Sequence, residues 1–215
     1  MQARFSGLYA VTPDLADTPR LLGLVEAALQ GGASLLQYRN KQASAARRMQ
    51  QAGVLLALCR QYGVPLIIND HVELCRTLDA DGVHLGGNDA DVAAARAQLG
   101  SGKIIGASCY DRLDLAAMAK AAGADYVAFG SCFGSSTKPL AIRAPLELFS
   151  QARQQIGLPL VAIGGIDAEN AGLAMAAGAD ALAVISAVFA VPEVRLAAQF
   201  FSNLYTRNPS EPNPS

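Results

Sequence analysis

The sequence predicts an α/β fold, a TIM (β/α)8 barrel in a single domain. Eight short and almost continuously apolar segments recur along the 215 residues, separated by stretches in which apolar residues have helical spacing. One sequence pattern recurs at 31–39, 78–86, 121–130 and 176–186: a small residue and Ala-Asp or Ala-Ser, followed by an apolar run. The starts of these patterns are about two βα units apart, so each of the three intervals holds one further strand, and another at 7–12 precedes the first pattern, which gives eight strands in all.

Each predicted strand is apolar on both faces, as expected where helices cover one side and a barrel interior the other. The eight strands lie within 7–12, 31–39, 64–70, 78–86, 103–108, 121–130, 158–165 and 176–186. Helical patterns follow at 18–30, 44–62, 71–78, 90–99, 111–122, 146–156, 168–177 and 192–205. An open doubly wound sheet is the alternative, but no G-x-G-x-x-G follows the first strand.

No linker interrupts the pattern, so we expect one barrel domain over 1–206. The proline-rich, polar stretch 207–215 is predicted to be a disordered tail. Hydrophobic residues make up 52% of the chain and charged residues 16%, which suits a compact α/β core.

The charge balance argues against nucleic acid and membrane partners, because the net charge is −1 and no basic stripe is present. The four cysteines have no CxxC spacing and there are only two histidines, so neither a zinc site nor a disulfide framework is predicted. No signal-peptide-like or membrane-spanning apolar run is present, and we expect a cytoplasmic protein. A homo-oligomer is compatible with the sequence.

Active sites of TIM barrels lie at the carboxyl ends of the strands, so the residues that follow each strand are the candidates. The cations there are Arg39, Lys41 and Lys138, and the carboxylates are Asp70 and Asp89. Backbone N–H groups are offered at Gly164-Gly165 and Ile185-Ser186, in the two loops that commonly bind phosphate in this fold. Gln37, Arg39 and Lys41 alternate along a predicted strand and should share one face.

Each carboxylate has a structural alternative. Asp70, with Glu73 three residues on, has capping-box spacing for the helix at 71–78, and Asp89 could cap the helix at 90–99. Together, on neighbouring strand ends beside cations, they predict a Mg²⁺ site that a substrate diphosphate would complete.

Five other side chains near the strands and strand ends have alternative interpretations. His84 lies inside a strand and is interpreted as a hydrogen-bonded core histidine, and Cys109 and Cys132 as small apolar fillers. His71 follows Asp70 and is a weaker candidate for ligand contact. Lys138 could be a loop charge, a Schiff-base nucleophile or a phosphate anchor; its hydroxyl-rich surroundings argue against a desolvated amine.

From 7–12 to 183–189 the chain resembles the thiamine-phosphate synthase family. The resemblance rests on an ordered set of motifs: Q-Y-R-N-K (37–41), N-D (69–70), G-G-N-D-A (86–90), G-A-S (106–108), S-S-T-K-P (135–139), A-I-G-G-I (162–166) and V-I-S-A (184–187).

The resemblance implies a Mg²⁺-dependent transferase that joins a hydroxymethylpyrimidine diphosphate to a thiazole phosphate and releases pyrophosphate. It implies that the pyrimidine diphosphate is bound by Gln37, Tyr38, Arg39, Asn40, Lys41 and Asn69, with Ser108 and Lys138 as further diphosphate contacts. Arg39, Lys41, Ser108 and Lys138 are the implied catalytic residues, and Asp70 and Asp89 the implied metal ligands. The thiazole phosphate would meet Ser135, Ser136, Thr137, Gly165, Ile185 and Ser186.

The chain departs from the family in two places. The loop G-S-C-F-G-S-S-T-K (130–138) lacks the prolines common there, and His71 stands where a second aspartate is frequent. Three other interpretations compete: a Schiff-base aldolase or isomerase using Lys138, a sister group that isomerises the thiazole phosphate, and a non-catalytic phosphate-binding protein. Arg39, Lys41, Asp70 and Asp89 favour the synthase over the sister group, which lacks the paired aspartates.

Overall fold

Eight parallel strands close into a barrel in the computed structural model, which describes residues 5–86, 91–134 and 143–206. Each strand pairs with the next, and the eighth pairs with the first, where Leu8 lies beside Leu182. The strands are β1 (Gly7–Val11), β2 (Leu35–Tyr38), β3 (Leu66–Asn69), β4 (Gly82–Leu85), β5 (Ile104–Tyr110), β6 (Tyr126–Phe129), β7 (Leu160–Ile163) and β8 (Ala181–Val184). The predicted TIM barrel is confirmed.

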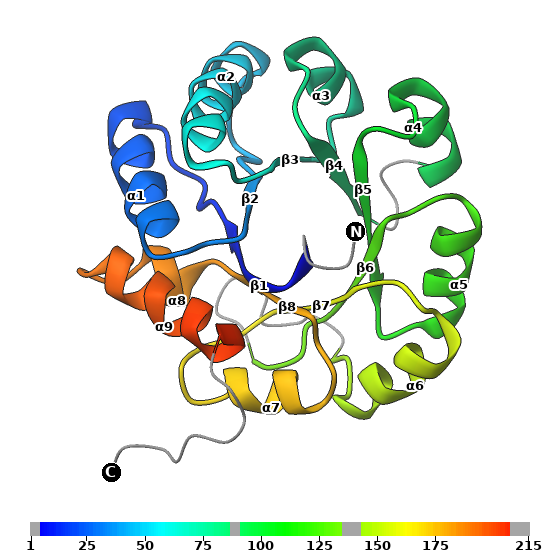
Figure 1. The fold of residues 1–215 in the computed structure, drawn as a ribbon. Helices are drawn as coiled ribbons and strands as arrows, with labels where there is room; N and C mark the ends of the chain where they lie inside the picture. Colours follow the sequence, from blue (N-terminus) through cyan, green and yellow to red (C-terminus); the bar gives the residue numbers. More distant parts are fainter. Residues whose placement is uncertain (1–4, 87–90, 135–142, 207–215) are drawn as a thin grey trace.

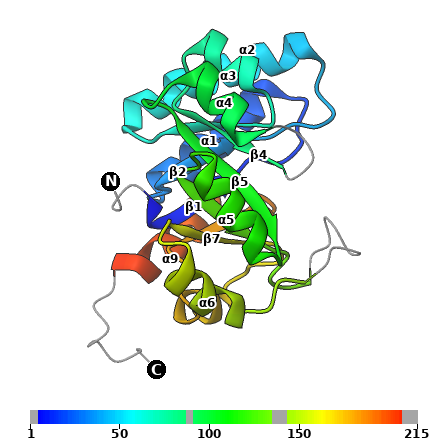
Figure 2. The same cartoon turned by 90° about the vertical axis from the view of Figure 1, so that its right-hand side faces the viewer.

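Helices surround the strands as an outer ring (Figure 1). They are α1 (Thr18–Gln30), α2 (Ala45–Tyr62), α3 (Val72–Leu78), α4 (Val92–Leu99), α5 (Leu113–Ala121), α6 (Glu147–Gln155), α7 (Ala171–Ala176), α8 (Ser186–Phe189) and α9 (Val194–Thr206). At right angles, α2 to α4 lie on one side of the barrel and α6 and α9 on the opposite side (Figure 2). The predicted helical stretches all contain a helix, and α8 is an additional single turn directly after β8.

Alternation along each strand divides the buried side chains into two cores. Tyr9 and Val11 of β1 point into the barrel, whereas Leu8 and Ala10 pack outward against the helices. The interior core also contains two aromatic rings, Phe5 and Tyr126, with ring centroids 5.2 Å apart. Because the interior is filled by side chains, ligands can reach the barrel only at its ends.

Among the described residues, no helix is long and apolar enough to cross a membrane.

Candidate active site

The carboxyl ends of the eight parallel strands form one rim of the barrel, and the predicted site residues that the structure describes lie there. Gln37 is within β2, Asn69 ends β3 and Ser108 lies in β5. The others follow strand ends directly: Arg39 and Lys41 after β2, Asp70 after β3, Gly165 after β7, and Ile185 and Ser186 after β8.

The segment after β2 is held by a carboxylate that the sequence analysis did not single out. Asp14, in the loop after β1, accepts two hydrogen bonds of 3.2 Å from Nη1 of Arg39 and one of 2.8 Å from the backbone N–H of Lys41. Thr12 accepts a hydrogen bond from the N–H of Arg39 and donates one to its carbonyl. The expectation that Arg39 and Lys41 lie on the strand was wrong, because β2 ends at Tyr38. Beyond that point, the backbone of Arg39 is hydrogen-bonded to the side chain of Thr12, in the loop after β1.

Gln37 therefore does not share a surface with the two cations. Its side chain is buried and donates a 2.9 Å hydrogen bond from Nε2 to the Tyr9 hydroxyl inside the barrel.

Tyr38 and Asn40 use their polar atoms to support this loop. The Tyr38 hydroxyl donates to Oε1 of Gln51 in α2 at 2.8 Å, and Nδ2 of Asn40 donates to the same oxygen and to the Leu15 carbonyl. Burial raises the pKa of Tyr38 to about 12, so this hydroxyl keeps its proton. Both residues nevertheless line a small hollow together with Lys41, Asn69 and Asp70. Their assignment as substrate ligands stays a prediction.

Asp70 has an unusual backbone conformation for a residue with a side chain. Its φ is 62°, in the left-handed region, and its N–H donates to the His84 carbonyl at 2.8 Å. One carboxylate oxygen accepts from Nδ2 of Asn69 at 2.6 Å and the other from the N–H of Gly86 at 3.3 Å. The carboxylate is thus fixed between the ends of β3 and β4, and backbone conformations of this kind are concentrated at functional sites.

The capping alternative for Asp70 was wrong. The N-cap of α3 is His71, which makes no side-chain cap bond, and Glu73 pairs with Arg76 at 2.8 Å. For α4, the N-cap is Asp91, whose carboxylate accepts from the N–H of Ala93 at 2.8 Å. Asp89 and the loop residues Ser135, Ser136, Thr137 and Lys138 lie outside the described residues.

Ser108 faces a buried histidine. Its Oγ lies 2.8 Å from Nε2 of His84, and Nδ1 of His84 lies 2.9 Å from the Tyr126 hydroxyl. Burial lowers the pKa of His84 to about 4, because the charged ring would lose its hydration. His84 is therefore neutral near pH 7 and hydrogen-bonded at both nitrogens, in agreement with its interpretation as a core histidine.

The residues assigned to phosphate binding in the last two loops lie in the turns after β7 and β8, and that assignment stays a prediction. Gly165 has a φ of 66°, and a Cβ there would lie 2.3 Å from the Gly134 carbonyl oxygen, so glycine is required where the loops after β6 and β7 meet. Ile185 is the N-cap of α8, and Ser186, which is exposed, opens that helix.

Cys109 and Cys132 are buried, in agreement with their interpretation as small apolar fillers. All four cysteines are buried, and burial raises the pKa of the Cys109 thiol to about 12 and that of Cys132 to about 11. Within the described ranges, no cluster of three or more His, Cys, Asp or Glu side chains suits a metal ion.

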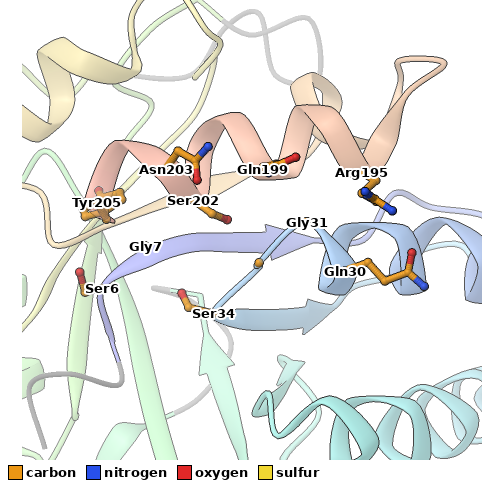
Figure 3. A pocket seen from close by; sticks show the side chains of 11 residues that line it. Ser6, Gly7, Gln30, Gly31, Ser34, Arg195, Gln199, Ser202, Asn203 and Tyr205 are labelled. Atoms are coloured by element: carbon orange, nitrogen blue, oxygen red, sulfur yellow. The ribbon is translucent and has the colours of Figure 1, made fainter. Parts of the chain in front are cut away.

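A larger hollow of about 460 Å³ lies at the opposite end of the barrel. Figure 3 shows it between the start of β1, the end of α1 and one face of α9, with Ser6, Gln30, Arg195 and Gln199 around it. In TIM barrels this end contributes to stability and the chemistry takes place at the other. The hollow is thus distinct from the candidate site.

Comparison with known proteins decides the family. The family model described as thiamine monophosphate synthase matches residues 8–188, from the first strand to the helix after the last. The chain belongs to the thiamine monophosphate synthase family. This confirms the resemblance and the predicted transferase class.

Curated relatives agree with this family over nearly the whole chain. The thiamine-phosphate synthase of Methylobacillus flagellatus is 58% identical over 199 residues, covering 93% of this chain and 95% of that protein. The thiamine-phosphate synthase of Thiobacillus denitrificans is 54% identical over 205 residues, covering 95% and 97%.

Solved structures show the same fold. The thiamine phosphate pyrophosphorylase of Pyrococcus furiosus superposes with a TM-score of 0.83 at 33% identity, covering 95% of this chain and 97% of that one. A 3-hexulose-6-phosphate synthase, at 17% identity and a TM-score of 0.67, shares the barrel alone.

Sequence reasoning missed Asp14 on this rim, and Tyr9 and Tyr126 in the barrel interior. Asp14 carried a usable signal, because T-P-D directly follows the first strand and a carboxylate at a strand end is a candidate by position. Tyr9 and Tyr126 carried none, since a tyrosine inside an apolar strand has the pattern of a core residue.

Proposed function

We propose that this chain joins a hydroxymethylpyrimidine diphosphate to a thiazole phosphate, forming thiamine phosphate and releasing pyrophosphate. The observation that carries the proposal is the family match over 8–188, which includes the rim residues Arg39, Lys41, Asp70 and Ser108. Its geometric support is the set of hydrogen bonds that these residues make with Asp14, Asn69 and His84.

The reaction begins with ionisation of the pyrimidine substrate. The bond from the exocyclic carbon to the diphosphate oxygen breaks, and the electron pair leaves with pyrophosphate. The electron-rich aminopyrimidine stabilises the cation. The thiazole nitrogen then forms the new bond with its own lone pair. The protein's contribution is to stabilise negative charge on the leaving group, the role assigned to Arg39, Lys41, Ser108 and Lys138.

Asp70 and Asp89 would hold Mg²⁺. Mg²⁺ prefers oxygen ligands and is commonly bound by one or two carboxylates plus substrate phosphates, which fits the fixed and partly exposed carboxylate of Asp70. Bound there, the ion would neutralise charge on the diphosphate.

The thiazole phosphate is assigned to the other side of the rim. Ser135, Ser136 and Thr137 offer hydroxyl groups, and Gly165, Ile185 and Ser186 offer the turns after β7 and β8. Backbone N–H groups at such turns suit a phosphate monoester.

No protein base is required, because the attacking nitrogen carries no proton. His84, which is buried next to Ser108, is neutral and hydrogen-bonded at both ring nitrogens. This agrees with a reaction driven by leaving-group stabilisation.

The purified protein should be mixed with both substrates and Mg²⁺, and thiamine phosphate and pyrophosphate measured by chromatography. We expect both products in equal amounts and neither with EDTA. Absence of product with Mg²⁺ would reject the proposal. A borohydride-trapped carbonyl adduct on Lys138 would instead favour the aldolase interpretation.

A further inference from the structure

A chain of hydrogen bonds crosses the barrel interior and joins Gln37 to Ser108. Nε2 of Gln37 donates to the Tyr9 hydroxyl at 2.9 Å, and the Tyr9 and Tyr126 hydroxyls are 2.8 Å apart. The Tyr126 hydroxyl is 2.9 Å from Nδ1 of His84, whose Nε2 is 2.8 Å from Oγ of Ser108. The five side chains come from five strands, β2, β1, β6, β4 and β5 in that order.

The three middle members are sealed from water and uncharged near neutral pH. Tyr9, Tyr126 and His84 are 1%, 0% and 7% exposed. Burial raises the pKa of Tyr9 and of Tyr126 above the ordinary range. Both ring nitrogens of His84 face hydroxyl oxygens inside this sealed core, where a charged ring would lose its hydration. Each tyrosine therefore carries one hydroxyl proton and the imidazole carries one N–H proton.

Because each hydroxyl and the imidazole has only one proton to donate, all the hydrogen bonds of the chain must have their donors on the same side. Because the Gln37 amide donates to Tyr9, the Tyr9 proton is directed to Tyr126 and the Tyr126 proton to Nδ1 of His84. His84 then carries its proton on Nε2 and donates to Ser108.

The direction decides what the two ends present to the rim. In this direction Ser108 accepts from His84, so its own hydroxyl proton remains for a ligand, and Gln37 keeps its carbonyl oxygen. In the opposite direction Ser108 would donate its hydroxyl proton to His84, and only its lone pairs would remain for a ligand. A phosphate oxygen is a hydrogen-bond acceptor, so it requires the first arrangement.

We propose that Tyr9, Tyr126 and His84 are positioning residues that orient the Ser108 hydroxyl as a donor to the diphosphate and fix the Gln37 amide with its carbonyl toward the ligand. The proposal rests on the proposed function for the identity of the ligand. In this role each of the three acts through the next member of the chain.

The direction of the chain can be measured without any substrate. With ¹⁵N-labelled histidine, the ring nitrogen shifts report which nitrogen carries the proton, and a His71→Asn variant assigns the spectrum because the chain has two histidines. At pH 7.5 we expect His84 with a protonated Nε2 and an unprotonated Nδ1. A protonated Nδ1 would overturn the proposed direction.

A double-mutant cycle tests whether the chain acts through Ser108. We expect Tyr126→Phe to lower kcat/KM for the pyrimidine diphosphate roughly ten-fold in the wild-type background, since one buried hydrogen bond is lost. In a Ser108→Ala background the same change should cost less than about two-fold. Equal losses in both backgrounds would mean a merely structural role and would overturn the proposal.

The matched control is Tyr205→Phe, which removes a part-buried hydroxyl bonded to the Ala179 carbonyl in a different part of the fold. It should leave kcat/KM unchanged in both backgrounds. If Tyr126→Phe does not fold, Tyr9→Phe breaks the same chain one link away and should show the same dependence on Ser108. If the wild-type protein makes no thiamine phosphate, the proposed function fails, while the histidine spectrum still decides the direction of the chain.

Discussion

Asp14 is the residue on which the order of the segment after β2 depends. Its carboxylate pairs with the guanidinium of Arg39 and also accepts from the backbone of Lys41, so one side chain fixes the two cations assigned to the diphosphate. The ion pair between Asp14 and Arg39 also opposes anion binding, because it must loosen before Arg39 can turn fully toward an incoming anion.

Asp14→Asn should separate activity from stability. The ion pair is partly exposed and contributes at most about 1 kcal/mol to the free energy of unfolding. We expect a loss of about ten-fold in kcat/KM, because Arg39 and Lys41 are no longer held in place. Steady-state kinetics and urea unfolding measure the two effects.

The control is Asp79→Asn, which weakens a comparable ion pair to Lys103 at the opposite end of the barrel. This variant should keep wild-type kinetics. If both variants lose activity equally, Asp14 has no special role at the rim.

The two aspartates around the start of α4 should behave in opposite ways. Asp91→Ala removes the N-cap and should cost about 1 kcal/mol of stability with little change in turnover. Asp89→Ala removes the proposed metal ligand and should lower Mg²⁺-dependent turnover at least 100-fold with little change in stability.

Thermal unfolding and the product assay, run on both aspartate variants at several Mg²⁺ concentrations, distinguish them. Full activity of Asp89→Ala at low Mg²⁺ would remove Asp89 from the metal site.

At the scale of elements, the contact between α1 and α9 depends on a glycine that ends α1. A Cβ at Gly31 would lie 2.5 Å from the Arg195 carbonyl oxygen and 2.6 Å from Cβ of Ala198. The backbone φ of Gly31 is −77°, so the requirement comes from close approach of the two helices and not from conformation. α9 packs against α1, α8 and β1, and so contributes to the closure between β8 and β1.

Gly31→Ala should therefore destabilise the protein by about 1–3 kcal/mol, the usual cost of inserting a methyl group into a packed contact. Gly23→Ala, in the same helix, is the matched control, because a Cβ there meets nothing within 4 Å. This second change should stabilise by about 0.5–1 kcal/mol through helix propensity. Denaturant midpoints of the two variants should shift in opposite directions, and equal shifts would contradict the packing argument.

The elements were predictable where their signal is local. Eight apolar runs and eight helical patterns gave the fold, because each strand is buried on both faces and each helix has a buried stripe. α8 was missed because four residues are too few to show a helical period. The end of β2 was misplaced because the tie between Thr12 and Arg39 joins residues 27 positions apart.

At the scale of the molecule, closure of the barrel explains which part of the site was predictable. Strand carboxyl ends meet at one rim in every such barrel, so position alone selected Arg39, Asp70 and Ser108. The interior chain was not predictable, because the bond between Tyr9 and Tyr126 spans 117 positions and depends on strand register. The register is set when the strands pair in the closed barrel, so the sequence of either strand alone does not show which of its residues will meet the other.

The proposed diphosphate and metal sites should couple to the stability of the whole barrel. A ligand that binds only the folded chain adds about 2.7 kcal/mol to the free energy of unfolding at 100 times its Kd, and a domain of this size gains about 2–4 °C per kcal/mol. Pyrophosphate together with Mg²⁺ should therefore raise Tm by about 5–10 °C. Pyrophosphate with EDTA, or Mg²⁺ alone, should raise it far less, since each completes the other's coordination.

Asp70→Asn is the matched variant for this thermal shift. The amide nearly preserves the shape of the side chain, which lies between Asn69 and Gly86, but removes its negative charge. Without ligand, Tm should fall by about 2–4 °C, because the amide has one accepting oxygen for the two donors and one hydrogen bond is lost. The joint effect of Mg²⁺ and pyrophosphate should largely disappear. A full shift in this variant would place the metal elsewhere on the rim, whereas no shift in the wild type would argue against a pyrophosphate site. The two results distinguish an incorrect assignment of Asp70 to the metal from an incorrect assignment of pyrophosphate to this site.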